Sequence, residues 1–238
     1  MRYAIYSDTH SNLEALTTFL NYSLSHHIDH YWMLGDIVGY GANPQQVSDK
    51  VFEISNIVIQ GNHDKAIVDD ALLEWFNDAA KQALLWTRTQ LDSQTKEKLA
   101  HLPPIYIHKN ITLAHGSPDR PEEFPYIDEW EEASKAFKAF KTPICFVGHT
   151  HLPQIFSERK KISGYLKEGT YQLSRDDRYI ISCGSVGQPR DMDTRLSFGI
   201  YDDKNHTIEL VRLPYAKEEA AKKIRVAGLP RFFADRLL

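Results

Sequence analysis

The chain has 238 residues, a formal net charge of −4, 42% hydrophobic residues and 25% charged residues. These values are ordinary for a soluble globular protein, and without a basic block they give no support to a nucleic-acid-binding surface. No apolar run approaches the ~18 residues of a membrane span, and the N-terminus indicates a strand instead of a signal peptide, so we expect a cytoplasmic location. Cys145 and Cys183 lie in apolar runs, where we expect buried reduced thiols and no disulfide.

The first sixty residues predict alternating strands and helices. The expected order is a strand at Tyr3–Tyr6, a helix beginning after Ser11-Asn12, a strand at Tyr31–Leu34, a helix from Pro44 to about Ile54, and a strand at Asn56–Gln60. Because strands joined by crossover helices run parallel, these segments favour a parallel sheet. In such sheets ligands bind beyond the carboxyl ends of the strands, so polar residues at these ends are candidate site residues.

Residues 67–102 show helical periodicity, which Pro103-Pro104 brings to an end. Its apolar positions include Leu72, Trp75 and Phe76, which we expect to pack against the rest of the chain. This helical insertion is either a cap over one side of the site or an extension of the core, and the sequence favours neither.

The remaining residues predict mostly strands. We expect strands at Ile105–Ile107, Ile111–Ala114 and Ile144–Val147, a helix at Glu129–Phe140, and five shorter strands at Gln154–Phe156, Thr170–Leu173, Tyr179–Ser182, Ser197–Tyr201 and Thr207–Leu213. The five shorter strands favour a second, largely antiparallel sheet. An amphipathic helix at about 217–227 and a last short helix follow. Without a linker or an internal repeat, residues 1–238 are expected to form one domain.

Polar residues follow five successive strands. They are Asp8, His10, Asp36, Asn62, His63, His115, His149 and His151. Any one of them is typical of an ordinary turn, a helix cap or a satisfied core histidine, but eight at five strand ends indicate a shared site. All except His63 form a suitable set of ligands for two metal ions. Imidazole, carboxylate and amide groups without thiolate suit manganese, iron, zinc, cobalt or nickel and argue against a structural zinc site.

These motifs resemble those of the calcineurin-like metallophosphoesterases. The matching segments are Asp8-Thr9-His10, Gly35-Asp36, Gly61-Asn62-His63-Asp64, His115-Gly116 and Gly148-His149-Thr150-His151, in the family's order. The resemblance spans residues 1 to about 200. The segment Gly184–Arg190 is similar to the bacterial branch often labelled phosphodiesterase or diadenosine-tetraphosphatase-like. The resemblance implies an α/β fold, a four-layer α/β/β/α sandwich with two central mixed sheets.

The resemblance also implies roles for the residues at the strand ends. One metal ion would be held by Asp8, His10, Asp36 and His151, and the other by Asp36, Asn62, His115 and His149. Asp36 would bridge the two ions, with manganese the first choice of metal. His63 would be the general acid facing the leaving group, held by Asp64.

The implied activity is dinuclear metal-dependent hydrolysis of phosphodiesters by a metal-activated hydroxide. The substrate would be a small-molecule or nucleotide phosphate ester, with no stable nucleic-acid partner and no membrane, and a homo-oligomer is compatible with the sequence. The alternatives are a phosphomonoesterase or dinucleoside-polyphosphate hydrolase, and a non-catalytic scaffold of the same fold. The presence of His63 argues against the scaffold.

One departure from the family concerns phosphate binding. Members that act as protein phosphatases carry a GDxVDRG-type motif after the bridging aspartate, whereas the segment Gly35–Gly41 lacks that arginine. This disfavours a protein phosphatase or a classical symmetric dinucleotide hydrolase. Arg190 and Arg195 are the candidate substitutes, because arginine binds phosphate oxygens in a bidentate manner. The alternative is that both are surface-loop residues.

Overall fold

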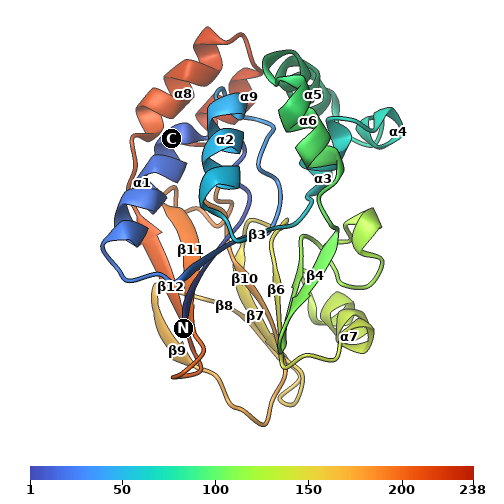
Figure 1. The fold of residues 1–238 in the computed structure, drawn as a ribbon, viewed down its shortest axis with the longest axis vertical. Coiled ribbons are helices and arrows are strands. Elements are labelled where there is room, and N and C mark those ends of the chain that lie inside the picture. The colour runs from blue at the N-terminus through green and yellow to red at the C-terminus, as the bar shows by residue number, and fades with distance from the viewer.

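The computed structural model describes residues 1–238 and contains two mixed six-stranded sheets that pack against each other (Figure 1). In spatial order the first sheet consists of β3 (Ile57–Val58), β2 (His30–Met33), β1 (Arg2–Tyr6), β11 (Leu196–Asp202), β12 (Thr207–Leu213) and β9 (Gly169–Gln172). Strands β1, β2 and β3 are parallel, as expected, while β11 runs antiparallel to β1. The carboxyl ends of β1, β2 and β3 therefore meet at one edge.

The second sheet has the same size and is also mixed. In spatial order it consists of β4 (Ile105–His108), β5 (Ile111–Ala114), β6 (Ile144–Val147), β10 (Tyr179–Cys183), β7 (Pro153–Ser157) and β8 (Ile162–Tyr165). Its central strands β5, β6 and β10 are parallel to one another. The second sheet therefore also has an edge where parallel carboxyl ends meet.

Alternation of side chains along each strand produces the layers. Tyr3 and Ile5 of β1 and Phe146 of β6 belong to the core between the sheets. The intervening residues of β1, Ala4 and Tyr6, pack in a separate core on the outer face of the first sheet. Because successive side chains of a strand point to opposite faces, each sheet has one face toward the other sheet and one toward helices.

Helices cover both outer faces. They are α1 (Leu13–Leu24), α2 (Pro44–Ile54), α3 (Asn62–Ala66), α4 (Asp70–Leu73), α5 (Asp78–Gln90), α6 (Ser93–Ala100), a 3₁₀ turn η1 (Pro121–Glu123), α7 (Trp130–Ala139), α8 (Lys217–Val226) and α9 (Arg231–Asp235). As expected, Asn12 caps α1, with its side chain accepting from the Ala15 N–H, and Pro44 begins α2. Figure 1 shows α1 and α2 on one side of the sheets and α7 on the other, which confirms the four-layer prediction.

The sequence did not predict how the later strands are shared between the sheets. The expectation of one antiparallel sheet over residues 154–213 is wrong, because β7, β8 and β10 join the second sheet whereas β9, β11 and β12 join the first. Alternation shows that a strand has a buried face but does not identify the neighbour with which it pairs. Strand β8 was not expected, since all four of its residues are exposed, and β3 is shorter than the expected Asn56–Gln60.

The insertion at residues 67–102 mainly extends the core. Leu84, Leu91 and Leu99 belong to the core on the outer face of the first sheet, and Ala80 and Ala83 pack with the C-terminal helices α8 and α9. None of the helices is both long enough and apolar enough to cross a membrane. Cys145 and Cys183 are buried free thiols, as expected.

Candidate metal centre

The candidate ligands from both sheets come together at the carboxyl ends of the strands. The first sheet supplies Asp8 and His10 after β1, Asp36 after β2, and Asn62 at the start of α3, and the second supplies His115 after β5 and His149 and His151 after β6. All except Asn62 are buried. The structure therefore brings together all seven residues that the sequence singled out as metal ligands, although ligation itself stays a prediction.

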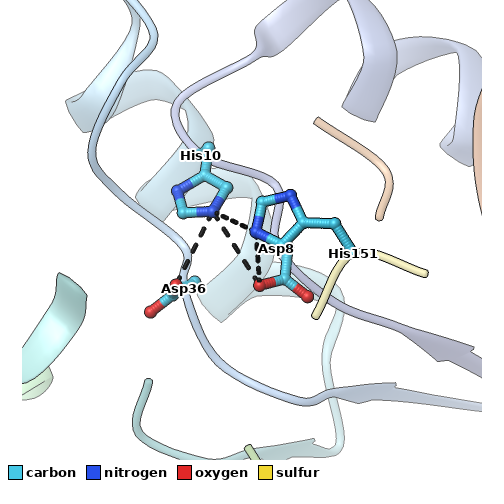
Figure 2. A group of neighbouring side chains, drawn as sticks. All are labelled: Asp8, His10, Asp36 and His151. Carbon is cyan, nitrogen blue, oxygen red and sulfur yellow. Dashed lines mark hydrogen bonds and ion pairs between the residues drawn. The ribbon is translucent and has the colours of Figure 1, made fainter. Parts of the chain in front are cut away.

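The first group that could hold a metal ion is Asp8, His10, Asp36 and His151 (Figure 2). Its side chains converge on one point. Nε2 of His10 lies 3.1 Å from Nε2 of His151 and 3.6 Å from Oδ2 of Asp36. Nε2 of His151 lies 3.2 Å from Oδ1 of Asp8.

The second group contains Asp36, His115 and His149. Nε2 of His115 lies 3.3 Å from Oδ2 of Asp36 and 3.1 Å from Oδ1 of Asn62, which places the Asn62 amide beside this group. Asp36 belongs to both groups, the position expected of a bridging carboxylate.

Hydrogen bonds fix the orientation of three of these imidazoles. Nδ1 of His10 lies 3.0 Å from the Val38 carbonyl, Nδ1 of His151 lies 2.5 Å from the Gln188 carbonyl, and Nδ1 of His115 lies 2.7 Å from the Leu34 carbonyl. Carbonyl oxygens only accept, so we assign a proton to Nδ1 of each ring, which in the neutral form leaves the lone pair on Nε2.

The candidate centre consequently contains hydrogen-bond acceptors that have no donor. In these neutral tautomers the two Nε2 atoms of His10 and His151 face each other at 3.1 Å with no proton to share. Buried Oδ1 of Asp8 has no hydrogen-bond partner. Uncompensated acceptors in a buried site are costly, and a cation among them would satisfy the whole set. The residues thus fit a divalent metal ion with nitrogen and oxygen ligands.

The backbone at the ligands is strained. The φ angles of Asp8, Asp36 and His149 are 55°, 57° and 69°, and those of His10 and His151 are 44° and 61°. Left-handed conformations are uncommon for residues other than glycine and concentrate at functional sites, where the surrounding structure maintains them. Five of the seven candidate ligands share this feature, which supports a functional role for the cluster.

Charges within the site shift the pKa values of its residues in the direction opposite to the effect of burial. Burial alone would raise the pKa of the Asp8 and Asp36 carboxyls, but neighbouring imidazoles bring both below the ordinary value. Burial also lowers the pKa of His115, but Asp36 and Asp8 outweigh it and raise this pKa to about 9. His149 has less carboxylate support, and burial lowers its pKa to about 3.

His63 lies beside the cluster without belonging to it. Its imidazole is buried, with its ring centroid 4.7 Å from that of His10, and Nε2 lies 3.0 Å from the Tyr40 hydroxyl. Nδ1 has no hydrogen-bond partner. Gly39 packs against this atom so closely that a Cβ at residue 39 would lie 2.3 Å from it.

The expectation that Asp64 holds the His63 imidazole is wrong. Its carboxylate instead accepts from backbone N–H groups, those of Asp36 and Gly61 at 2.8 and 3.1 Å and that of Ile37 at 2.9 Å. The reason is that α3 begins at Asn62 and directs Asp64 under the loop that follows β2. Asp64 therefore positions the backbone at Asp36.

A cavity of about 260 Å³ opens onto the cluster. Asp36, Asn62, His63, His149 and His151 are among the residues that line it. Its other walls are mainly aromatic or apolar and are formed by the segment between α4 and α5, by η1 and the segment after it, and by Tyr40. The charged residues of these walls are Arg190 and Glu123. The candidate centre is thus accessible from one side through a partly apolar cavity.

Most of the chain matches the model of one protein family. Residues 1–206 match the model of the calcineurin-like phosphoesterase superfamily domain. The chain belongs to the calcineurin-like phosphoesterases.

Three similar proteins cover 98–100% of this chain. An uncharacterized protein of Methanocaldococcus jannaschii, MJ0912, is 36% identical over an alignment of 238 positions that covers 98% of this chain and 96% of the relative. The crystal structure of a metallophosphoesterase from Sphaerobacter thermophilus is 38% identical, with a TM-score of 0.89 and coverage of 100% of this chain and 98% of the other. The hypothetical protein PH1004 of Pyrococcus horikoshii shares the fold, with 20% identity, a TM-score of 0.79 and coverage of 99% and 97%. The family resemblance expected from the motifs is confirmed.

The two candidate phosphate-binding arginines of this phosphoesterase have different surroundings. Arg190 lines the cavity, and its Nε is buried without a partner. Arg195 does not line the cavity, and its guanidinium is paired with Asp193 and Glu168 at 2.7 and 2.9 Å. The prediction that Arg195 is a phosphate clamp is therefore not supported, since two carboxylates already neutralise it.

The segment Gly184–Arg190 holds the backbone that follows β1, where Asp8 and His10 lie, by hydrogen bonds. The Val186 and Gly187 N–H groups donate to the Ser7 and Asp8 carbonyls at 3.0 and 2.9 Å. A Cβ at Gly187 would lie 2.0 Å from the Thr9 carbonyl oxygen, so only glycine permits this approach. The segment also supplies the Gln188 carbonyl that orients His151.

Sequence reasoning missed the aromatic residues around the centre of this phosphoesterase. Tyr40 contacts His63, and Tyr126 stacks on His149 with ring centroids 3.9 Å apart. Tyr40 lies between two glycines of a loop, a signal that could have been used, whereas nothing local distinguishes Tyr126. Trp75 was expected to pack against the chain, but this is wrong, because it is 87% exposed at the rim of the cavity.

Proposed function

We propose that this chain is a dinuclear metal-dependent phosphoesterase that acts preferentially on phosphodiesters. The observation that carries the proposal is the pair of ligand groups that share Asp36. One ion would be held by Asp8, His10, Asp36 and His151, and the other by Asp36, Asn62, His115 and His149. The excess of buried acceptors supports this assignment, and the ligand types suit manganese as well as iron, zinc, cobalt or nickel.

The ions would supply a nucleophile by acidifying water and would neutralise charge on the phosphoryl oxygens. The protein's own residues would orient the substrate. Arg190 is the cation of the cavity wall that could bind a phosphoryl oxygen. The carboxylate of Asp64 would hold the backbone around Asp36 and keep the shared ligand in place.

His63 would protonate the departing alkoxide. Burial, and secondarily the charge of Arg190, lower the pKa of His63 to about 4, although Asp36 opposes both. An anionic phosphate ester in the cavity would raise this pKa, because a nearby negative charge favours the imidazolium.

A phosphodiester fits the cavity better than a monoester. A diester carries one negative charge and two organic substituents, which suit walls that hold one arginine, one glutamate and several apolar side chains. We infer a small-molecule or nucleotide substrate and a cytoplasmic location, without a stable nucleic-acid partner, and a homo-oligomer is compatible with this function. The competing functions are a phosphomonoesterase or dinucleoside-polyphosphate hydrolase, and a scaffold without activity.

A substrate panel with the manganese-loaded protein tests the proposal. It contains bis-nitrophenyl phosphate, nitrophenyl phosphate, cyclic nucleotides and diadenosine tetraphosphate. We expect the highest kcat/KM on a diester. Faster turnover of nitrophenyl phosphate or of diadenosine tetraphosphate would favour one of the competing enzymes. No turnover by protein that binds two ions would favour the scaffold.

A further inference from the structure

An exposed tryptophan lies at the rim of the cavity. Trp75, in the segment between α4 and α5, is 87% exposed, and its neighbours Leu72 and Phe76 line the same cavity. Leu72 and Phe76 are half-buried, so the exposed Trp75 ring extends an apolar wall of the cavity. Apolar and aromatic side chains that line a cavity beside polar groups indicate a binding surface. Tyr126, which is 50% exposed, lines the cavity as well.

The aromatic surface formed by Trp75 and Phe76 contacts His63 through Phe76. The ring of Phe76 meets the His63 imidazole edge to face, with centroids 4.8 Å apart and an angle of 78° between the planes. Phe76 precedes Asn77, the N-cap of α5, and follows Trp75 directly. A group that leaves from the side of His63 therefore lies beside Phe76, in the cavity that Trp75 also lines.

The uncharged rings of this surface favour a planar aromatic group as the ligand. Tryptophan and phenylalanine present flat faces and no charge, so they bind planar rings by stacking. The cavity volume of about 260 Å³ is below the range of about 300–1,000 Å³ that encloses a drug-sized ligand, which leaves room for one ring system beside the phosphate. A protein segment would need a longer groove.

We propose that Trp75 and Phe76 bind a planar aromatic group on the departing alcohol, so that preferred substrates are phosphodiesters of nucleosides or aryl alcohols. Trp75 is then a specificity-determining residue. The proposal rests on the proposed function, because it takes His63 to face the leaving group.

The kinetic test compares two diesters with the same reacting bond. They are the methyl esters of adenosine 5′-phosphate and of ribose 5-phosphate, and both release a 5′-alkoxide. We expect the wild type to prefer the adenosine ester in kcat/KM by roughly 10-fold or more, as one stacked base provides. Trp75→Ala should remove this preference and Trp75→Phe should keep most of it.

The matched control is Leu85→Ala, because Leu85 is an exposed apolar residue of α5 that does not line the cavity. It should leave the preference unchanged. Phenyl methyl phosphate, run beside the adenosine ester, shows whether the aromatic group is a nucleobase or a simple aryl ring. Equal turnover of the adenosine and ribose esters, or a preference that survives in Trp75→Ala, would overturn the proposal.

A binding measurement separates this proposal from the proposed function. Calorimetric titration of the full-length protein with adenosine needs no turnover, and we expect Trp75→Ala to weaken binding by roughly 10-fold. Adenosine binding that depends on Trp75, without hydrolysis of any ester, would support the aromatic surface and reject the phosphodiesterase. Absence of adenosine binding combined with Trp75-dependent self-association would overturn it in favour of a protein contact.

Discussion

The Tyr40 hydroxyl lies 3.0 Å from Nε2 of His63. The Tyr40 ring in turn packs against Phe233 of α9, with centroids 4.5 Å apart, and against His10 at 4.4 Å. The C-terminal helix thus supports the residue that orients the proposed general acid. The hydroxyl can donate to Nε2 or accept from it, so the contact persists in both protonation states of His63.

Replacing His63 should impair turnover in a way that depends on the leaving group. His63→Ala should retain both metal ions, since the seven candidate ligands remain. It should lose about 10²–10⁴ in rate on an alkyl diester, where the alkoxide needs a proton, and much less on a nitrophenyl diester, whose phenolate leaves without one. Steady-state kinetics on both diesters, with metal analysis, measures the effect.

Tyr40→Phe serves as the milder variant in the same assay. It keeps the ring that packs on Phe233 and removes only the hydroxyl, so we expect a smaller defect with the same dependence on leaving group. Equal losses on alkyl and nitrophenyl diesters in His63→Ala would reject the acid role and leave His63 as a packing residue.

Replacing Asp64 should mainly lower the free energy of unfolding and should not act directly on the catalysed reaction. In Asp64→Asn, at least one of the backbone N–H groups of the loop after β2 would face an amide donor instead of an oxygen. An unsatisfied buried donor costs about 1–3 kcal/mol, so the free energy of unfolding should fall by about that amount. Denaturant unfolding measures it. If Asp64→Asn were as stable as the wild type but showed the leaving-group dependence of His63→Ala, the loop-positioning role would be wrong.

Replacing Asp36 should empty both metal sites. Asp36 is shared by the two ligand groups, so Asp36→Asn should lower the content of both ions, whereas the wild type should bind two per chain. Elemental analysis after equilibration with manganese provides the measurement. The control is Asp177→Asn, because Asp177 is also buried but accepts from Ser157 and the Arg159 N–H away from the site. One ion in the wild type, or loss of only one in Asp36→Asn, contradicts the bridging assignment.

The two arginines offer a matched comparison. Arg190→Ala should raise KM by roughly 10-fold, since a charge-assisted hydrogen bond to phosphate contributes about 1.5–3 kcal/mol. Arg195→Ala should leave KM unchanged, because Arg195 already pairs with Asp193 and Glu168 outside the cavity. Equal effects of the two substitutions would show that Arg190 acts through the overall charge alone.

The sequence predicted the residues of the centre because each follows a strand with a local signature. Asp8, Asp36 and His149 could be placed from apolar runs that stop at a polar residue, and the parallel order of the first strands brought Asp8 and Asp36 to one edge. The partner of Asp64 could not be found in this way, since it depends on the direction in which α3 leaves β3. The exposure of Trp75 was missed for a related reason, because periodicity shows that residues share a face but not what covers it.

The ligands come from both sheets, and this has a consequence for biosynthesis. His10 and His151 meet although 141 residues separate them, and β1 finds its antiparallel neighbour only in β11 at Leu196–Asp202. A nascent chain that ends after α6 contains Asp8, His10, Asp36 and Asn62 but none of the second sheet's imidazoles. The complete set of candidate ligands is assembled only once most of the chain has left the ribosome, so we expect metal binding to follow the synthesis of both sheets. A product truncated before His149 would lack part of the proposed ligand set of either ion.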